Sequence, residues 1–441
     1  MSAGRVGSHV ARRLAVAVVG VLICLWLMWT AARGGAARLL SNYGAGAGVM
    51  ESAHRAVSIS PADPESYVGR AVALLDVNEA KAAASDYERA IALRPRDFRL
   101  WMDLGNARDQ AGDAAGAIAA FKEATELAPF YAQTHWQFGN LLLRAGRYDE
   151  ALAELRRASV IRPALALQVI DLTWGIYKGD AQAVESVIQP QTAAARMALA
   201  VYFAQRGKGD DAIRLFRESN PVADKDRRSL LAALLTSKRF LQAYDVWASF
   251  HDPGREQAKD RRPQAEAPGA KPPLPGLVDG SFESEIRLDD PGFGWQINPN
   301  AQAVEFSLDS GDPEAGARSL LVKWNGDSPP AREVISQIVL VEPQKRYQLN
   351  FAARTRNLVT AGLPIVTVAD PTAQGFPGSK LAQSSPLAQD MIGWQKFSLT
   401  FETNGTTHAV RIAIERQHCS MAICPIFGQA WFDGFTMSQY R

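Results

Sequence analysis

A repeat of 34 residues constrains the fold of this chain more than any other feature of its sequence. Sliding the sequence against itself by that length aligns four prolines and four alanines: Pro61, Pro95, Pro129 and Pro163, with Ala56, Ala90, Ala124 and Ala158. Proline is about 5% of an average protein, so three further matches at a fixed offset from one proline have a chance probability on the order of 10⁻⁴. A period in this range predicts stacked two-helix units.

Each repeat has small residues where its two helices pack and a proline where the chain turns. In the best copy, Gly105 and Ala117 lack bulk, which lets two antiparallel helices approach closely, and Phe121 fills the gap between neighbouring pairs. The closing Pro129 lacks an N–H and disfavours helix at the preceding residue. No pair buries its apolar face alone, so we expect the pairs to stack.

These residues resemble the tetratricopeptide repeat family. The copy that fits best has Arg108 where the family usually has tyrosine, and it carries the rest of the pattern in Trp101, Leu104, Gly105, Gly112, Ala117, Phe121, Ala124 and Pro129. Clear copies run over 64–95, 98–129 and 132–163, and weaker ones follow. We expect an all-α solenoid of about five to six helix pairs over 52–250.

The resemblance also implies where partners bind, because the first helix of each pair lines a concave groove in that family. The register assigns eight residues to this groove: Arg99, Met102, Asn106, Asp109, Gln133, Trp136, Asn140 and Arg144. An asparagine amide offers both a donor and an acceptor, so Asn106 and Asn140 suit the backbone of an extended protein partner. Simple solvation explains both asparagines equally well.

The N-terminal segment predicts a membrane anchor. Residues 14–32 contain no charged side chain and follow Arg5, Arg12 and Arg13, and their length suits one helix across a bilayer. A cleaved signal peptide normally has a shorter apolar core, although the Ala- and Gly-rich flank keeps cleavage open as an alternative. We take 1–13 as cytoplasmic, 14–32 as the transmembrane helix and 33–51 as a juxtamembrane segment. The more basic flank usually stays in the cytoplasm, so we expect a single-pass protein of a bacterial inner membrane with its bulk in the periplasm.

Composition and motifs argue against two function classes. The net charge is only +2, and no stretch interleaves basic with aromatic residues, so no nucleic-acid partner is expected. The six histidines lack metal-ligand spacing, and neither a phosphate-binding glycine loop nor a G-x-S-x-G elbow is present. We therefore expect no enzymatic activity, although two hydrolytic carboxylates far apart in sequence stay possible.

A change in composition divides the chain after the repeats. Residues 251–276 are rich in proline, alanine and charge, which predicts an extended linker. The period then becomes alternating, in strand-length runs at 303–309, 318–324, 347–354, 363–370, 394–403 and 408–416 with turn residues between them. We expect an all-β jelly-roll sandwich over 277–441, so that the whole chain is multi-domain.

Motifs along this second domain resemble the galactose-binding-type jelly roll of carbohydrate-binding modules. They occur in the order LVDGSFES, GW, VEPQKRYQLNFAARTRN, GWQKFSLTF and AWFDGFTM. The resemblance implies a polysaccharide ligand and a structural calcium ion held with the help of Glu283 and Asp433, since calcium prefers hard oxygen ligands. Solvated or hydrogen-bonded carboxylates are an equally good interpretation of these two residues. No other cofactor is expected.

The sugar-binding residues are predicted from exposure. Trp295, Trp394 and Trp431 match core aromatics of the resembling fold, whereas Trp324, beside Asn325 and Gly326, is the best candidate for an exposed platform under a sugar ring. Alternation along one strand places a polar group of three residues opposite the core, where they contact either hydroxyls or water: Gln348, Asn350 and Arg354.

Two cysteines close the list of candidates. Cys419 and Cys424, with four residues between them, favour a disulfide over free thiols or a metal site with His418.

Together these features predict an outward-facing membrane scaffold that recruits protein partners and binds glycan, as an assembly factor for cell-envelope or exported polysaccharide. The alternatives are a secretion or envelope scaffold whose sandwich docks proteins, and a glycan hydrolase.

Overall fold

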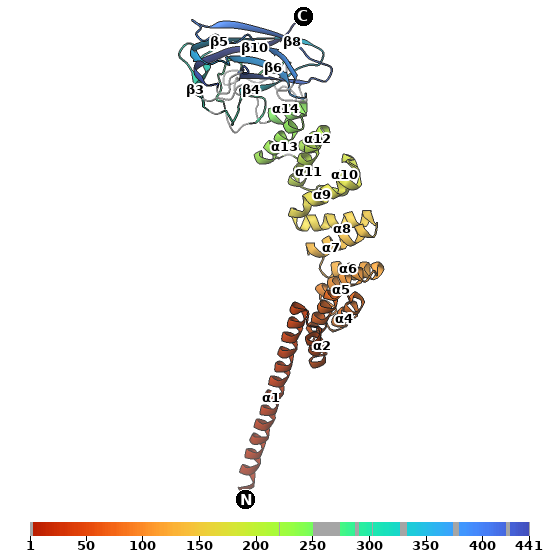
Figure 1. The fold of residues 1–441 in the computed structure, drawn as a ribbon. Coiled ribbons are helices and arrows are strands. Elements are labelled where there is room, and N and C mark those ends of the chain that lie inside the picture. The colour runs from red at the N-terminus through yellow and green to blue at the C-terminus, as the bar shows by residue number, and fades with distance from the viewer. Residues whose placement is uncertain are drawn as a thin grey trace. The chain divides into compact units, whose positions relative to one another are not determined.

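The computed structural model describes residues 3–219, 221–249, 274–286, 291–301, 303–326, 333–373, 379–419 and 424–440. The chain divides into two compact units, Met1–Gln189 and Pro190–Arg441, which we describe separately. The first unit is helical, and the second joins two helix pairs to a β-sandwich (Figure 1).

The first unit consists of antiparallel helix pairs in the register that the repeat predicts. Helices α3, α5 and α7 begin at Pro64, Phe98 and Ala132, as expected from the 34-residue offset. The helices are α1 (Ala3–Ala47), α2 (Met50–Ile59), α3 (Pro64–Asp76), α4 (Ala80–Leu93), α5 (Phe98–Gln110), α6 (Ala114–Leu127), α7 (Ala132–Arg144), α8 (Tyr148–Ile161), α9 (Ala166–Ile176) and α10 (Ala181–Ile188).

Aspartates and glycines fix where many of these helices begin and end. The side chains of Asp63, Asp97 and Asp113 accept hydrogen bonds from backbone N–H groups in the first turns of α3, α5 and α6, which satisfies donors that a helix start leaves free. Gly112 has a φ of +79° in the turn before α6, a conformation that glycine adopts without strain.

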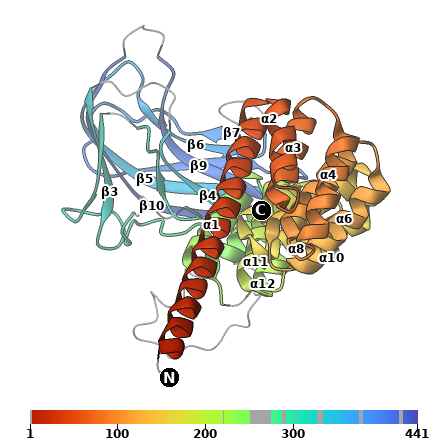
Figure 2. The same ribbon diagram turned by 90° about the horizontal axis from the view of Figure 1, so that it is seen from below.

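Helix α1 does not end where the sequence predicts the membrane boundary. It continues to Ala47, and its last turns pack against α2 and α3 (Figure 2). Ala37 and Ser41 are buried there, and the Ser41 hydroxyl donates to the Glu65 carbonyl at 2.7 Å. Most of the expected juxtamembrane segment 33–51 therefore belongs to α1 and packs on the neighbouring helices, so the helical stack begins well before residue 52. Its Ala- and Gly-rich composition hid this, because close packing there depends on small residues rather than on an apolar stripe.

The second unit begins with four helices: α11 (Ala193–Gln205), α12 (Gly209–Arg217), α13 (Asp224–Thr236) and α14 (Phe240–Ala248). With these, the described part of the chain contains six helix pairs from α3 onward, in line with the expected five to six. The expected linker 251–276 falls almost entirely outside the described residues, which resume at 274.

The sandwich packs directly on the last helix pair. Phe293 is fully buried, with its ring 5.1 Å from that of Tyr244 and 5.8 Å from that of Trp247, both on α14. The Lys238 ammonium, just before α14, donates to the Thr372 carbonyl at 2.9 Å. Gly292 adjoins the Trp247 ring and leaves no room for a Cβ. The sandwich is thus held by contact and not only by a tether.

Two antiparallel five-stranded sheets form the sandwich, as the alternating pattern predicts. Sheet A has the order β1-β4-β9-β6-β7, and sheet B has the order β2-β3-β10-β5-β8. The strands are β1 (Gln296–Ile297), β2 (Val304–Asp309), β3 (Ser319–Gly326), β4 (Glu333–Leu340), β5 (Arg346–Val359), β6 (Pro364–Asp370), β7 (Ser379–Gln383), β8 (Gln395–Glu402), β9 (Ala409–Arg416) and β10 (Ile426–Gln439). Figure 1 shows α14 on the side of β4 and β6, with β5, β8 and β10 beyond them.

Candidate functional site

The residues predicted to line the solenoid groove share one side of the first helices of two pairs. We call the set of Arg99, Met102, Asn106, Asp109, Gln133, Trp136, Asn140 and Arg144 the α5–α7 face. All eight side chains are exposed or partly exposed. A guanidinium nitrogen of Arg144 lies 2.5 Å from a carboxylate oxygen of Asp109. This ion pair joins α5 to α7, so the register prediction brings these two residues together.

The two asparagines of this face keep hydrogen-bonding capacity. The Asn140 amide donates to the Trp136 carbonyl at 3.0 Å, which leaves its own oxygen to accept. Asn106 has no side-chain hydrogen bond to any residue that the structure describes. Both amides are therefore available to a partner's backbone, which offers donors and acceptors in alternation.

Asp103 on α5 is a polar residue that the sequence analysis missed. Burial raises the pKa of its carboxyl from 3.8 to about 6, and the nearby charge of Asp97 contributes. No basic side chain within the described residues pairs with it. The sequence alone does not single out Asp103, because its burial depends on how the preceding repeat packs against α5.

His135 has a structural role that the register makes visible. It stands where the preceding repeat has Trp101, whose indole donates to the Pro95 carbonyl at 2.9 Å. Its Nε2 lies 3.0 Å from the Pro129 carbonyl, and its Nδ1 lies 2.6 Å from a carboxylate oxygen of Glu154. A backbone carbonyl only accepts, so Nε2 donates to Pro129, and Nδ1 shares a hydrogen bond with the Glu154 carboxyl group. The bond to Glu154 raises the pKa of His135 despite burial.

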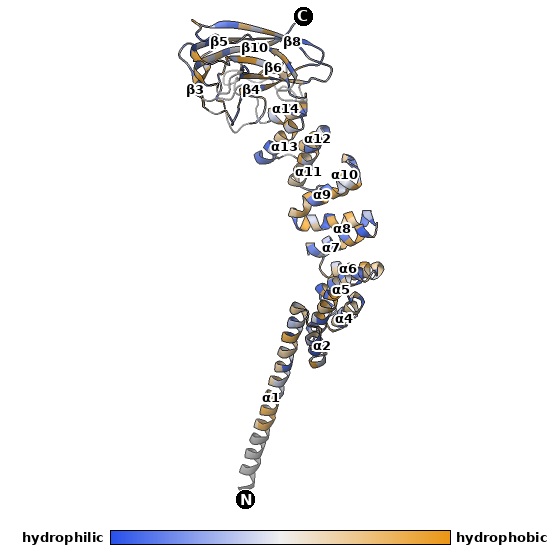
Figure 3. Cartoon of the chain, in the orientation of Figure 1, coloured by the Kyte–Doolittle hydropathy of each residue, from blue (hydrophilic) through white to orange (hydrophobic). Residues whose placement is uncertain are grey.

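The N-terminal helix is long and apolar enough to cross a membrane. By length and composition, the candidate span lies within Val16–Ala47, whose most apolar 18 residues have a mean hydropathy of 2.0. Side chains along 16–33 are mostly exposed, Trp26 and Trp29 among them. Figure 3 shows apolar colouring along the middle of α1. A core helix of a soluble protein would be mostly buried, so an anchor or a signal sequence fits this helix better.

The prediction for Trp324 is wrong. Its side chain is only 2% exposed, in the core between the sheets, where alternation on β3 places it with Leu320 and Val322. The adjacent asparagine and glycine made it look like a strand end, but β3 continues to Gly326. Of the three predicted core tryptophans, Trp295 is buried in the core, Trp431 is buried outside that core beside Arg354 and Arg356, and Trp394 is half-exposed.

The three polar residues of β5 share the outer face of sheet B. Tyr347, Leu349 and Phe351 point into the core, as alternation predicts. The Gln348 amide donates to Asn350 Oδ1 at 3.1 Å and to Ser398 Oγ at 2.7 Å, so these three residues form a small polar cluster.

Arg354, in contrast, is held within the protein. Its guanidinium lies 5.0 Å from the ring centre of Trp394 and 4.6 Å from that of Trp431. It also pairs with Asp312 at 2.8 Å and reaches Asp309 at 3.9 Å. A cation enclosed in this way braces the outer face of sheet B and has little freedom to follow a sugar hydroxyl.

Glu283 and Asp433 match the hydrogen-bonded interpretation better than the calcium one. The Glu283 carboxylate accepts from the N–H groups of Ala317 and Arg318, at 2.7 and 3.1 Å. Buried Asp433 accepts from those of Glu314 and Ala315, at 2.8 and 2.9 Å, and burial raises its pKa. Donors that point at these oxygens oppose a cation in the same place. Among the described residues, no three His, Cys, Asp or Glu side chains group as metal ligands.

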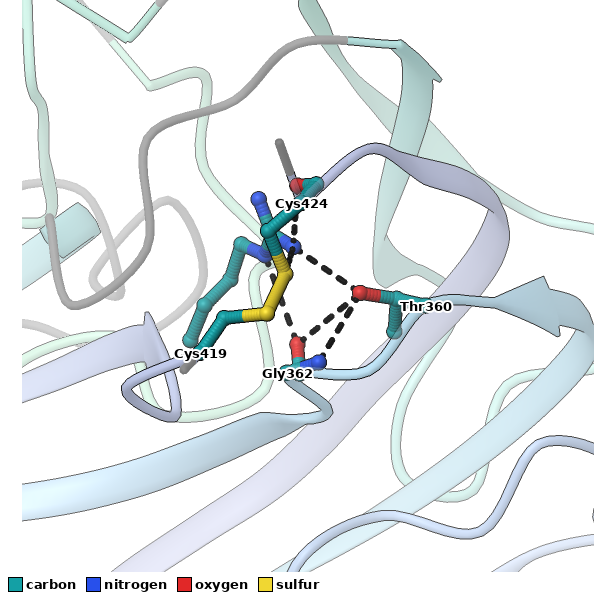
Figure 4. The surroundings of a disulfide bond; sticks show 5 residues. Thr360, Gly362, Cys419 and Cys424 are labelled. Atoms are coloured by element: carbon teal, nitrogen blue, oxygen red, sulfur yellow. Dashed lines mark hydrogen bonds between the residues drawn. A yellow bond between two sulfur atoms is a disulfide. The ribbon is translucent and has the colours of Figure 1, made fainter. Parts of the chain in front are cut away.

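The predicted disulfide between Cys419 and Cys424 is confirmed, with 6.3 Å between the Cα atoms. It lies beside Arg416, a buried arginine whose guanidinium donates to Thr360 Oγ1 at 2.8 Å, to the Cys424 carbonyl at 2.9 Å and to the Gly362 carbonyl at 3.3 Å (Figure 4). The disulfide thereby fixes one of the carbonyls that this buried cation needs.

Comparisons with known proteins agree with the repeat pattern. Two family models, each described as tetratricopeptide repeat, match residues 68–132 with 181–221, and residues 110–166. No curated protein matches the chain.

Three solved structures match parts of the chain. A crystal structure of MamA is 15% identical, covers 38% of this chain and 84% of its own, and has a TM-score of 0.26. MamA from residue 41 to its end, from Desulfovibrio magneticus RS-1, is 20% identical and covers 30% of this chain and 75% of its own, with a TM-score of 0.28. A structure described as CBM4 structure and function is 16% identical and covers 37% of this chain and 100% of its own, with a TM-score of 0.28. Likenesses of this size do not identify a function.

Proposed function

We propose that this chain, which contains tetratricopeptide repeats, is a membrane-anchored scaffold that lies mostly outside the cytoplasm. It recruits protein partners through the α5–α7 face and binds glycan through its sandwich, as an assembly factor for cell-envelope or exported polysaccharide. No catalytic step is part of this proposal.

The anchor and the disulfide support the location. The exposed apolar side chains of α1 need a lipid environment, because a stripe of this size in water would drive aggregation. Disulfides persist in oxidising compartments such as the periplasm, which supports placing the sandwich there. Resistance of the chain to extraction by alkaline carbonate would separate an uncleaved anchor from a removed signal sequence.

The observation that carries the partner-binding proposal is the pair of available amides on the α5–α7 face. Affinity capture from detergent-solubilised membranes tests it by comparing the wild type with the double variant Asn106→Ala, Asn140→Ala. The control is Ser85→Ala, at an exposed position of α4. We expect the captured partner set to be lost in the double variant alone. Equal capture by all three proteins would reject a role for this face.

The glycan part of the proposal rests on the motif order and on the polar outer face of sheet B. Gln348, Asn350 and Ser398 offer amide and hydroxyl groups that suit sugar hydroxyls. Binding of the full-length chain in detergent to an array of bacterial polysaccharides tests it. The proposal would be contradicted if the chain bound none of these polysaccharides.

One observation favours the alternative of a protein-docking sandwich. Ile392, Val359 and Phe427 are exposed apolar side chains on this domain, and such residues are common in protein interfaces. Loss of a captured protein on Ile392→Asp, with polysaccharide binding unchanged, would favour the alternative.

A further inference from the structure

The cations on the outer face of sheet B are paired, with one exception, among the residues that the structure describes. Of the five described cations on this face, four have a carboxylate within 4 Å: Lys323 with Glu305, Arg346 with Glu402, Lys396 with Glu314, and Arg354 with Asp309 and Asp312. Arg356 is exposed on β5, and among the residues that the structure describes no carboxylate pairs with it.

Packing holds Arg356 in place without neutralising it. Its guanidinium lies 5.5 Å from the ring centre of Trp431, which is itself buried and donates its indole N–H to Asp309 at 2.6 Å. An arginine that rests on an aromatic ring keeps its outer N–H groups free. The buried Trp431 ring therefore supports the Arg356 guanidinium, whose N–H donors face solvent.

Unused groups of other kinds lie beside Arg356. The strand pairing puts Gln429 directly opposite it, and the Gln429 amide has no hydrogen bond to any described residue. Phe427, two residues along β10 and on the same face, is 48% exposed and faces Val359 and Asn325 across the ladders. Neighbouring strands are about 4.8 Å apart, and alternate residues about 7 Å, so the three side chains span roughly one to two sugar rings.

We propose that Arg356, Gln429 and Phe427 form a subsite for an acidic polysaccharide and that Arg356 pairs with the carboxylate of a uronic acid unit. The inference rests on the proposed glycan binding of the sandwich and adds the chemical class of the sugar. The planar guanidinium matches a carboxylate through two parallel N–H donors. Gln429 supplies an amide to ring hydroxyls, and the exposed Phe427 ring offers a stacking surface.

Charge pairing on the rest of the face gives the subsite its selectivity. A neutral glycan gains nothing from Arg356 and must leave it solvated, whereas a uronate pairs with the one cation of this face that has no carboxylate partner among the described residues. Elsewhere on the face each cation already has its acid, so an added carboxylate would meet a repelling carboxylate there.

Binding of the full-length chain, in nanodiscs, to four probes tests the proposal. The probes are polygalacturonate, alginate and their carboxyl-reduced neutral forms. The variants are Arg356→Gln, Arg356→Lys and, as the matched control, Arg346→Gln, which removes the same charge from the same face of the same strand. Circular dichroism and the count of free thiols show that each variant is folded.

We expect a uronate polymer to bind more tightly than its reduced form. Arg356→Gln should weaken uronate binding about tenfold or more and leave binding of the reduced form unchanged, since a charge-assisted bidentate bond is lost. Arg356→Lys should fall between, and Arg346→Gln should change affinity less than about threefold.

Three results would overturn the subsite. Equal affinity for the acidic and reduced polymers would reject the sugar class while leaving glycan binding in place. Equal losses of uronate affinity in Arg356→Gln and Arg346→Gln would show that the net positive charge of the face, and not a subsite at Arg356, attracts the polymer. Failure of every probe, including a neutral bacterial polysaccharide array, would reject the inference together with the glycan-binding proposal.

Discussion

Replacing Asp103 by asparagine should stabilise α5 at neutral pH. The folded-state pKa of Asp103 is about 6, above its ordinary value of 3.8, because burial penalises the carboxylate. The protonated side chain therefore contributes stability that is fully present below about pH 4 and lost as the pH rises through 6. Asparagine has the same shape and no charge, so Asp103→Asn keeps this contribution at every pH.

The size of the effect follows from the two pKa values. A rise from 3.8 to about 6 corresponds to roughly 3 kcal/mol, because one pKa unit is worth about 1.36 kcal/mol. Asp103 is partly exposed, so solvent screening lowers this figure, and we expect about 1 to 3 kcal/mol at pH 7.5. This range equals roughly 5- to 150-fold slower amide exchange wherever α5 opens locally.

Hydrogen exchange read by mass spectrometry on peptides from Phe98–Gln110 measures this directly. Wild type and variant are compared at the same pH, so the chemical exchange rate cancels. Protection should differ at pH 7.5 and converge at pH 4. The matched control is Asp109→Asn on the same helix, which breaks a partly exposed ion pair and should destabilise α5 by about 1 kcal/mol or less. An equal or faster exchange rate in Asp103→Asn at pH 7.5 would refute the reasoning.

Further substitutions test the packing of each unit. Gly105→Leu should lower the thermal stability of the solenoid by about 1 to 3 kcal/mol, because a Cβ there meets the Phe121 ring at 2.6 Å; Gly112→Asn, in open space at a positive φ, should cost under about 1 kcal/mol, and equal losses would argue against the close approach. Phe293→Ala should cost about 3 to 5 kcal/mol and expose α14 to limited proteolysis, unlike Leu241→Ala at an exposed position of α14; unchanged cleavage of α14 would contradict the docking of the sandwich. The double variant Cys419→Ser, Cys424→Ser should lose about 2 kcal/mol from the sandwich, as expected for so short a loop, and a wild-type melting curve indifferent to reducing agent would contradict this.

The repeat and the alternating pattern predicted most of the fold because both arise from local packing rules. A small residue at Gly105 and a proline at Pro129 recur wherever two helices cross and the chain turns, so the register located helix starts to the residue. The six strand runs were found in the same way, since a core on one side of a strand imposes a period of two. Strands β1, β4, β7 and β10 were not among these runs; in β4, the sequence EVISQIVL hid the period because buried residues stand on consecutive positions.

What the sequence did not reveal depends on contacts between distant segments. Trp324 is buried because β3 runs two residues further than the turn-forming neighbours indicate, and Arg354 is enclosed by Trp394 and by loop residue Asp312. The extension of the stack into α1 relies on Ser41 meeting α3, which only the pairing of the two helices reveals. Arg356 stands out only once the partners of its neighbours are known.

Photo-crosslinking in living cells tests the scaffold most directly. A photoreactive amino acid replaces Asn140 on the α5–α7 face or, as the control, Ser85 on α4, and membranes are analysed after irradiation. The account predicts a discrete adduct with a second protein from position 140, found in the carbonate-resistant membrane fraction and absent from position 85. Identical adducts from both positions, or none from position 140, would contradict it.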